Sequence, residues 1–245
     1  MIILCDSCGC NDNNPDTFKT PPSTTIELYK DIMDENNRIA HKNWHFFTEK
    51  GVLCINIMGS PGCGKTSLIE GIAKHIPPYE IAVIQGDLES DIDKQRLLKA
   101  DIDTLQINTH SGCHLNAAMI QDSIPKLQIN GKKFLFIENV GNLVCPAGIK
   151  LGEHLNIVIS STPEGSDKPR KYPHIFYNAD AIIISKIDLS EAVNFIKSGY
   201  IKSIRKINSE APIFMVSIKN TKSFQEVADF LVQKRSHIKN HSHKH

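Results

Sequence analysis

Residues 59–66 read Gly-Ser-Pro-Gly-Cys-Gly-Lys-Thr and fit the pattern G-x-x-x-x-G-K-[ST] at every fixed position. In such a loop the glycines let backbone N–H groups point at phosphate oxygens, the lysine reaches the β- and γ-phosphates, and the last hydroxyl ligates Mg²⁺. An apolar run precedes the loop and a helical pattern follows it, so the positive end of that helix also faces the phosphates. The sequence therefore predicts a nucleotide-binding loop made of Gly59, Ser60, Gly62, Cys63, Gly64, Lys65, Thr66 and Ser67, with Cys63 at a variable position.

Two carboxylates stand at the ends of later apolar runs, where they could complete a magnesium site. Asp87 and Glu138 each close such a run, and parallel sheets bind their ligands at the carboxyl ends of the strands. Each acid could hold a magnesium-bound water or orient the attacking water; otherwise it is a solvated loop acid. Gly141 offers a hinge and a backbone N–H for the γ-phosphate. We expect catalysis from Lys65, Asp87 and Glu138, and magnesium ligation from Thr66, Asp87 and Glu138.

The stretch Ser185-Lys186-Ile187-Asp188 follows a further apolar run and is similar to the guanine-reading sequence Asn-Lys-x-Asp. In that sequence the aspartate accepts hydrogen bonds from the N1 and N2 hydrogens of guanine, which adenine lacks. Ser185 is shorter than asparagine and has no amide, so the choice between GTP and ATP stays open. Ser217 and Lys219, after the last apolar run, could close over the base. We expect nucleotide contacts from Lys186, Asp188 and Ser217.

Soft metal ligands recur beside these loops as Cys113-His114 and Cys145. Thiolate and imidazole suit Zn²⁺, Ni²⁺ or copper and disfavour Mg²⁺ and Ca²⁺. The run "CHLNAAMIQDSI" predicts a helix that the Cys-His pair opens, and adjacent helical residues diverge by about 100°. The pair would therefore chelate one ion only at the very start of the helix or together with a partner subunit. Cys145 lies before a proline in a glycine-flanked loop and is either a ligand or a buried thiol.

Both ends of the chain also carry metal-binding residue types. Three of the seven cysteines stand close together as Cys5, Cys8 and Cys10. They are either a metal-binding claw or an accident of a frayed terminus. The C-terminal tail is rich in histidine, a composition that is typical of metal binding, and contains His237, His241, His243 and His245.

The bulk properties limit the function classes. The chain has 245 residues and a net charge of +1 from 28 basic and 27 acidic residues, so no global field draws it to nucleic acid or to an acidic membrane. No apolar run approaches the roughly 20 residues that span a bilayer. We therefore expect a cytoplasmic protein without nucleic-acid binding or membrane insertion, whose cysteines are thiols or metal ligands rather than disulfides.

Seven apolar runs alternate with stretches of helical periodicity, which predicts an α/β fold with a mostly parallel sheet that is buried on both faces. Residues 1–24 read as a flexible tail, 25–235 as one domain that begins with an amphipathic helix over 25–48, and 236–245 as a disordered His-rich tail. We expect helices over 65–76, 91–100 and 224–235. The expected strands lie within 51–58, 80–85, 104–108, 133–139, 155–161, 179–185 and 211–217.

The phosphate loop, "GDLESDIDKQR", "GCHL", "ENVGNLVCP" and "SKID" occur in this order, and with them the chain closely resembles the HypB family over about residues 25–235. The resemblance implies a three-layer P-loop NTPase fold of the dimerising G-domain class that binds GTP or GDP with Mg²⁺ and hydrolyses GTP slowly. It further implies a homodimer formed in response to nucleotide. In that dimer Lys168 would approach the guanine of the partner subunit.

The same resemblance gives the metal-type residues roles. Cys113, His114 and Cys145 match a nickel or zinc site at the dimer interface, and Cys145 would lie in the second switch loop. Cys5, Cys8 and Cys10 match an N-terminal nickel site, although residues 1–4 precede them here. The implied function is a GTPase that carries nickel for [NiFe]-hydrogenase maturation, with accessory proteins and the hydrogenase large-subunit precursor as partners. The alternatives are a GTPase for urease nickel insertion and a nickel or zinc storage protein with nucleotide-gated dimerisation.

Overall fold

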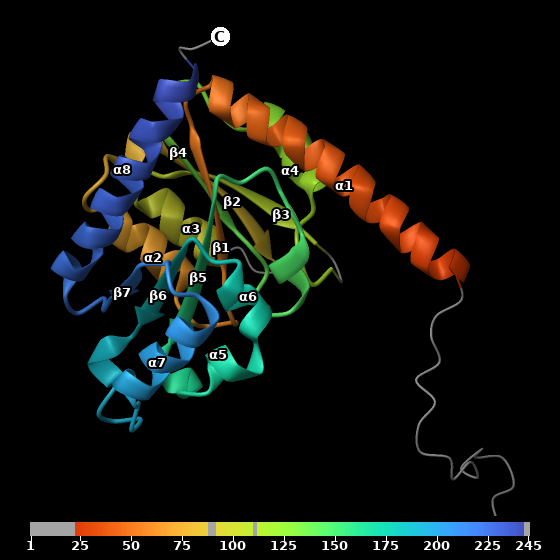
Figure 1. The fold of residues 1–245 in the computed structure, drawn as a ribbon. Helices are drawn as coiled ribbons and strands as arrows, with labels where there is room; N and C mark the ends of the chain where they lie inside the picture. Colours follow the sequence, from red (N-terminus) through yellow and green to blue (C-terminus); the bar gives the residue numbers. More distant parts are fainter. Residues whose placement is uncertain (1–22, 88–91, 110–111, 243–245) are drawn as a thin grey trace, which may run out of the picture.

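A parallel sheet forms the centre of the protein (Figure 1). The computed structural model describes residues 23–87, 92–109 and 112–242. The described residues form a 7-stranded sheet in the order β3-β2-β4-β1-β5-β6-β7, and every pairing is parallel. The strands are β1 (Leu53–Met58), β2 (Ile81–Asp87), β3 (Asp103–Asn108), β4 (Phe134–Glu138), β5 (Leu155–Ser161), β6 (Ala181–Ser185) and β7 (Ile213–Met215).

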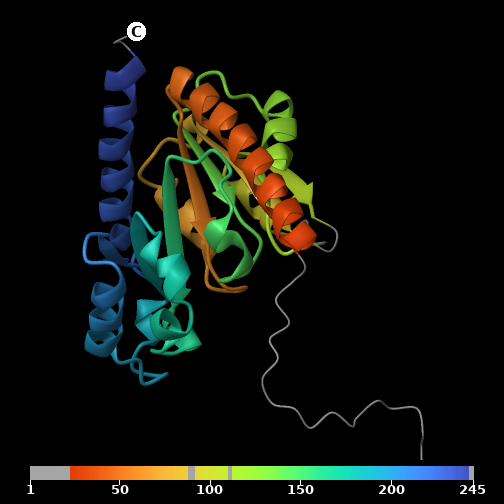
Figure 2. The same ribbon diagram turned by 45° about the vertical axis from the view of Figure 1, so that its right-hand side comes forward.

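Helices cover both faces of this sheet, because its strands are apolar on both sides. Ile55 and Ile57 of β1 pack with α2, α3 and α8, whereas Cys54 and Met58 face α1, α4, α6 and α7. Figure 2 shows α8 and α1 on opposite sides of the strands. The helices are α1 (Ser23–Glu49), α2 (Lys65–Ile72), α3 (Ile92–Lys99), α4 (Ala117–Ser123), α5 (Lys168–Lys171), α6 (Pro173–Tyr177), α7 (Lys197–Ile207) and α8 (Gln225–Ser242), and the 3-10 helices are η1 (Pro78–Glu80), η2 (Ile124–Lys126), η3 (Cys145–Gly148), η4 (Thr162–Glu164), η5 (Ile187–Leu189) and η6 (Thr221–Phe224).

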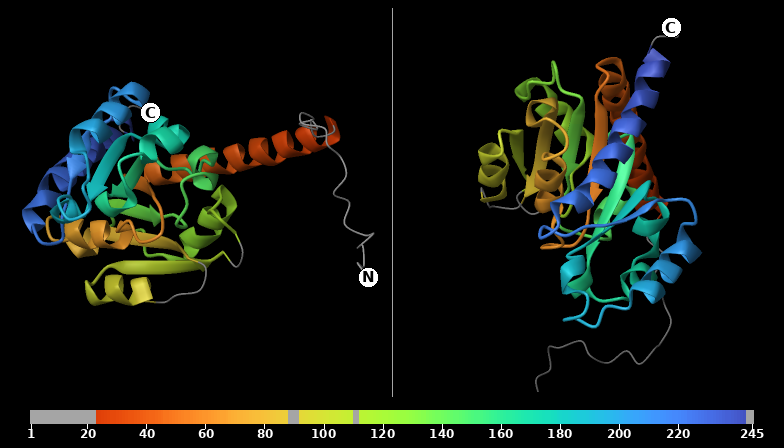
Figure 3. Two further views of the ribbon diagram at one scale, coloured as in Figure 1. Left: turned by 90° about the horizontal axis from the view of Figure 1, so that it is seen from below. Right: turned by 90° about the vertical axis from the view of Figure 1, so that its left-hand side faces the viewer.

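The long helix α1 is attached to the domain through its C-terminal half, while its N-terminal part extends past the sheet (Figure 3, left). Ala40 and Phe47 are buried, as is the polar Asn43. The Nδ2 atom of Asn43 donates to the carbonyls of Ala117 and Leu151, each at 2.9 Å. This helix therefore clamps the start of α4 and the chain that leads into β5.

Most predicted elements are confirmed, including all seven strands and the helix over 25–48. One prediction is wrong at the C-terminus. We expected disorder from residue 236, but α8 continues to Ser242. The first turns of α8 are anchored by buried Val227 and Leu231, and a helix that is already nucleated adds residues at little cost. The predicted tail 1–24 lies almost entirely outside the described residues, as do residues 243–245.

Within the described part of the chain, no helix combines the length and the apolar character that a bilayer crossing requires.

His154, directly before β5, joins helix α1 to strand β1. Its Nδ1 accepts the N–H of Cys54 at 3.0 Å, and its Nε2 lies 3.0 Å from Oγ1 of Thr48. Because Nδ1 accepts, the proton of the neutral ring is on Nε2 and is donated to Thr48. Burial lowers the pKa of His154 to about 4, since a charged ring would lose its solvation.

We predict that His154 makes the fold sensitive to acid. Its pKa is lower in the folded than in the unfolded state, so its contribution to stability is complete above about pH 6.5 and is lost as the pH falls toward 4. The full effect is on the order of 3 kcal/mol. His154→Asn keeps an acceptor for Cys54 and removes the titration. Denaturant unfolding at pH 7 and pH 5 should show a smaller loss of stability in the variant; equal losses would contradict the assignment.

Candidate nucleotide and metal site

The phosphate loop connects the end of β1 to α2 in a preformed cradle. Gly62 and Gly64 adopt positive φ angles of 71° and 101°, which side chains other than glycine rarely tolerate. The Nζ atom of Lys65 lies 3.4 Å from the carbonyl oxygens of both Gly59 and Ser60, and this lysine is 9% exposed. The ammonium group is therefore held over the loop, where a bound phosphate would lie.

A buried carboxylate stands against the hydroxyl that we expect to ligate magnesium. Thr66 Oγ1 donates to Oε1 of Glu138 at 2.8 Å, and Gln85 Nε2 donates to Oε2 at 2.9 Å. Burial raises the pKa of Glu138, although Gln85, Lys65 and Thr66 each work against that rise. A hydroxyl and a carboxylate side by side are oxygen donors of the kind that Mg²⁺ prefers, so these residues fit the ion.

The contribution of Gln85 was missed at the level of sequence, because it depends on the pairing of β2 with β4. That register sets Gln85 beside Glu138. Asp87 is placed only by its backbone, which ends β2 opposite Asn108. The magnesium and catalytic roles of Asp87 stay predictions, since its side chain lies outside the described structure.

The segment 139–148 lies directly on the phosphate loop. Asn142 forms an isolated antiparallel bridge with Gly59. A Cβ atom at Gly141 would lie 2.8 Å from Cγ of Pro61, so only glycine allows this approach. The Oδ1 atom of Asn142 accepts the N–H of Val144 at 2.7 Å and of Cys145 at 3.3 Å. The backbone of Cys145 is thus held by a residue that touches the loop.

The predicted base-reading residues come together on the other side of the loop. Ser217 Oγ donates to Oδ1 of Asp188 at 2.6 Å, and Lys219 Nζ lies 3.3 Å from Oδ2. The hydrogen bond from Ser217 is the main cause that lowers the pKa of Asp188. Beside them lies a cavity of about 70 Å³, whose lining includes Gly64, Ser185, Lys186, Ser217 and Ile218. The carboxylate is therefore ionised and oriented before any base arrives.

Ser185 and Lys186 bind the phosphate loop itself. Ser185 Oγ donates to the carbonyl of Cys63 at 2.5 Å, and Lys186 Nζ donates to the carbonyl of Gly62 at 2.7 Å. The serine that replaces asparagine thus supports the loop through its hydroxyl. These contacts do not decide between guanine and adenine, which Asp188 would have to do.

Lys168 contacts the phosphate loop of its own chain. Its Nζ lies 3.4 Å from Ser60 Oγ and 3.4 Å from Oε1 of Glu164, and 5.3 Å from the centre of the Tyr172 ring. The prediction that Lys168 approaches the guanine of a partner subunit is not tested by one chain and stays a prediction.

Three soft ligands converge in a small cluster. The ligand atoms of Cys113, His114 and Cys145 all lie within 4.8 Å of one another, and Cys113 Sγ is 3.4 Å from Nδ1 of His114. Hydrogen bonding with Cys145 is the first cause that raises the pKa of Cys113, which is exposed. Two sulfurs and one imidazole nitrogen suit Zn²⁺ or Ni²⁺ and leave a position open.

The predicted start of the helix near this cluster is corrected. We expected Cys113 and His114 to open α4, but the helix begins at Ala117. Asn116 caps it by accepting the N–H of Met119 at 2.9 Å, and asparagine is a strong helix N-cap. The Cys-His pair therefore lies in the preceding loop, where the divergence of adjacent helical residues does not apply.

The cysteines outside this cluster fall into two groups, those buried in the core and those outside the described residues. Cys54 is fully buried in the core, and burial raises the pKa of Cys63 to about 12, so neither thiol is a ligand or a nucleophile at neutral pH. Cys5, Cys8 and Cys10 lie outside the described residues. His237 is exposed on α8, whereas nothing is described of the side chains of His241, His243 and His245.

A loop of this kind at the end of a central parallel strand, with a carboxylate on its threonine, defines a P-loop nucleotide-binding protein. Residues 53–215 match the family described as CobW/HypB/UreG, nucleotide-binding domain. The "Hydrogenase/urease maturation factor HypB" of Helicobacter pylori is 40% identical over 227 residues, which cover 91% of this chain and 92% of that protein.

Two solved structures have the same fold. A crystal structure of HypB from Helicobacter pylori in complex with nickel has a TM-score of 0.80 at 40% identity and covers 83% of this chain and 96% of that one. The crystal structure of the hydrogenase maturation factor HypB from Archaeoglobus fulgidus has a TM-score of 0.77 at 38% identity, covering 82% and 99%. The chain belongs to the HypB family within the CobW/HypB/UreG nucleotide-binding proteins. The predicted resemblance and fold class are confirmed.

We predict that metal protects Cys113 and Cys145 from alkylation. Without metal both thiols should react with iodoacetamide, whereas Cys54 and Cys63 should not, because they are buried. Zn²⁺ or Ni²⁺ should slow modification of Cys113 and Cys145 at least about tenfold, since a coordinated thiolate is no longer a free nucleophile. Peptide mapping by mass spectrometry resolves each site. Mg²⁺ is the control and should not protect; labelling unchanged by Zn²⁺ and Ni²⁺ would contradict the cluster.

Proposed function

We propose that the chain is a GTP-hydrolysing nickel metallochaperone that supplies nickel for [NiFe]-hydrogenase maturation. The observation that carries the proposal is that the segment 139–148, which contains Cys145, packs directly on the phosphate loop. Gly141 lies against Pro61, and Asn142 forms a bridge with Gly59. Membership of the HypB family supports the pathway. The nickel complex of the relative from Helicobacter pylori supports the cargo.

Hydrolysis would proceed mainly by positioning and neutralisation of charge. Lys65 and the N–H groups of the loop would bind the β- and γ-phosphate oxygens, and the Thr66 hydroxyl would turn toward Mg²⁺. Mg²⁺, when bound, supplies positive charge to the phosphates. Glu138, fixed by Gln85, would orient a water. The water oxygen forms a bond to the γ-phosphorus as the bond to the bridging oxygen breaks, and the electron pair leaves with GDP. The two protons of the water leave with the released phosphate as dihydrogen phosphate.

The guanine specificity would come from Asp188. Its carboxylate is ionised and oriented by Ser217 and Lys219, and its two oxygens match the two donors on the edge of guanine. Adenine offers no such pair of donors. We therefore expect GTP rather than ATP as the substrate, with Ser185 supporting the loop instead of reading the base.

The metal would bind at Cys113, His114 and Cys145, as Ni²⁺ in transit or as Zn²⁺. The exposed position of Cys113 and the three-donor set favour completion of the site by water or by a partner subunit. A homodimer formed in response to GTP would bring two such sites together. In it Lys168 would leave Ser60 and contact the nucleotide of the partner subunit.

The N-terminal cysteines would act before this cluster. Cys5, Cys8 and Cys10 would capture nickel and pass it to the described site. From there it would go to hydrogenase accessory proteins and the hydrogenase large-subunit precursor in the cytoplasm. No contact with nucleic acid and no membrane insertion are part of this proposal.

Hydrolysis of GTP gives the direct test of the enzyme. The purified chain with Mg²⁺ should release phosphate from GTP, and Lys65→Ala should lower kcat/KM at least about 100-fold, because one charged contact to the transition state is lost. Equal rates in the two proteins would contradict the proposal. The same assay with ATP tests the base: ATP turnover as fast as GTP turnover would contradict the role of Asp188.

A second candidate function is nickel insertion into urease, because the relative from Helicobacter pylori is described as a hydrogenase and urease maturation factor. Affinity capture separates the two targets. Recovery of urease accessory proteins without hydrogenase accessory proteins would favour urease. Nickel delivery that persists unchanged in Lys65→Ala would instead favour a storage protein whose nucleotide only gates dimerisation.

A further inference from the structure

A hydrogen-bonded network of polar side chains crosses the middle of the sheet. Asn139, directly after β4, donates from Nδ2 to Oδ1 of Asn56 in β1 at 3.2 Å. Asn56 donates to Oδ1 of Asn156 in β5 at 2.9 Å, and Asn156 donates to Oε1 of Glu153 at 3.1 Å. Asn139 and Asn56 are 1% and 0% exposed. Amides are seldom buried this deeply unless each group is bonded, so these hydrogen bonds tie the residue after β4 to β1 and β5.

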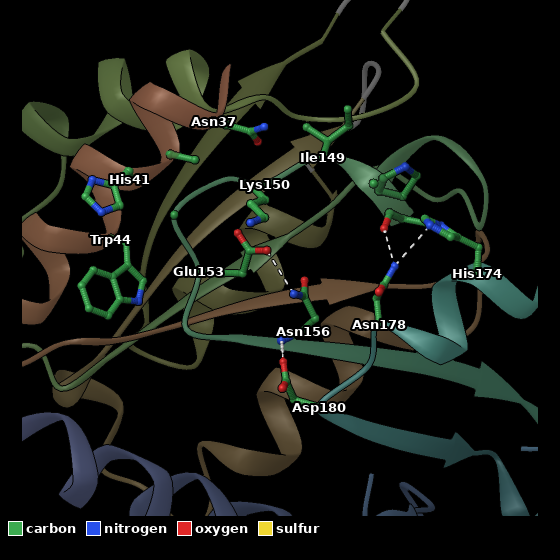
Figure 4. A pocket seen from close by; sticks show the side chains of 15 residues that line it. Asn37, His41, Trp44, Ile149, Lys150, Glu153, Asn156, His174, Asn178 and Asp180 are labelled. Atoms are coloured by element: carbon green, nitrogen blue, oxygen red, sulfur yellow. Dashed lines mark hydrogen bonds between the residues drawn. The ribbon is translucent and has the colours of Figure 1, made fainter. Parts of the chain in front are cut away.

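The end of this hydrogen-bonded network at Asn156 is firmly anchored. It lies in the wall of a cavity of about 640 Å³ between α1 and the segment before β5. Figure 4 shows Glu153 and Asp180 converging on Asn156, with Trp44 on another wall of the cavity. Oδ2 of Asp180 accepts the backbone N–H of Asn156 at 2.7 Å. This end therefore acts as a fixed support.

The other end of the network, at Asn139, lies between the nucleotide site and the metal cluster. Oδ1 of Asn139 accepts the N–H of Leu115 at 3.1 Å and that of Val140 at 3.0 Å. Leu115 is fully buried and directly follows the metal ligand His114. Asn139 directly follows Glu138, whose carboxylate accepts the hydroxyl of the phosphate loop. One side chain thus joins the nucleotide side of the segment to the metal side.

We infer that Asn139 is a positioning residue that couples nucleotide state to the metal ligand His114 through the Leu115 amide. This inference rests on the proposed function and adds a second connection to the one through Cys145. Asn142 holds the backbone of Cys145, and Asn139 holds the residue after His114, on either side of Gly141. A movement of the segment 139–148 on nucleotide binding would therefore reach two of the three ligands, His114 and Cys145.

The test uses the full chain with Cys5→Ser, Cys8→Ser and Cys10→Ser, so that Ni²⁺ titrates only the described cluster and the C-terminal histidines. Affinity is measured with GDP and with a non-hydrolysable GTP analogue, by the absorption band of nickel–thiolate coordination. In this reference protein the two affinities should differ about 5- to 150-fold, the usual range of coupling between sites. Asn139→Ala should lower this ratio at least about threefold, because the Leu115 bond is lost while the connection through Asn142 and Cys145 remains.

Asn56→Ala is the matched control. It removes the same bond between Asn139 and Asn56 but leaves the bond to Leu115. It should lower the thermal unfolding temperature about as much as Asn139→Ala and keep the ratio of affinities. An intact ratio in Asn139→Ala overturns the inference, as does an equal loss in both variants, which would mark a purely structural network. Equal Ni²⁺ affinities with GDP and with the GTP analogue in the reference protein would contradict the nucleotide-coupled function itself, and the inference with it.

Amide hydrogen exchange gives a second readout on the unsubstituted chain, which does not depend on how well Asn139→Ala folds. The Leu115 N–H should exchange at different rates with GDP and with the GTP analogue, because its acceptor moves with the segment. An identical rate in the two states overturns the inference.

Discussion

The close packing of the segment 139–148 on the phosphate loop is the contact on which the site depends. It requires glycine at position 141, where a Cβ atom would lie 2.8 Å from Cγ of Pro61. The segment begins next to Glu138, which accepts the hydroxyl of Thr66, and it contains Cys145 of the soft-metal cluster. In the proposed function, a phosphate with Mg²⁺ and a soft cation would thereby meet at one short stretch of chain. A shift of this stretch by one of them would then reach the other.

The parallel sheet makes that arrangement possible. β4 lies between β1 and β2, so the phosphate loop after β1 and the carboxylate at the end of β4 meet at one edge. The predicted base-reading residues follow β6 and β7 at the same edge. Three residues after His114, the carbonyl of Ala117 accepts a hydrogen bond from Asn43 of α1. The chain that follows the Cys-His pair is therefore bonded to a helix as well as to the strands.

Local patterns in the sequence predicted the parts of the protein whose causes are local. Continuous apolar runs identified the strands, because strands buried on both faces have no polar alternation. The spacing of glycines with Lys65 and Thr66 identified the phosphate loop. The metal cluster was predicted by residue type and by resemblance, and the structure supplies the proximity of its atoms.

Other features depend on contacts between distant parts of the chain and were not predicted. Gln85, Asn139 and Asn142 matter through strand register and through the packing of the segment on the loop. The start of α4 was set too early, because apolar periodicity does not locate the cap at Asn116. The end of α8 was set too early, because the polar composition after residue 235 hides a helix that continues from an anchored start. The role of Cys5, Cys8 and Cys10 stays a prediction.

The most direct test of coupling through the segment 139–148 is the affinity for GDP with and without Ni²⁺. Linkage requires that metal and nucleotide alter each other's binding by the same factor. Fluorescent GDP would be titrated into the chain with Cys5→Ser, Cys8→Ser and Cys10→Ser, and into the same chain with Cys145→Ser added. We predict that Ni²⁺ shifts the Kd of GDP in the first protein, and that the shift disappears in the second. No shift in the first protein, or an equal shift in both, would contradict it.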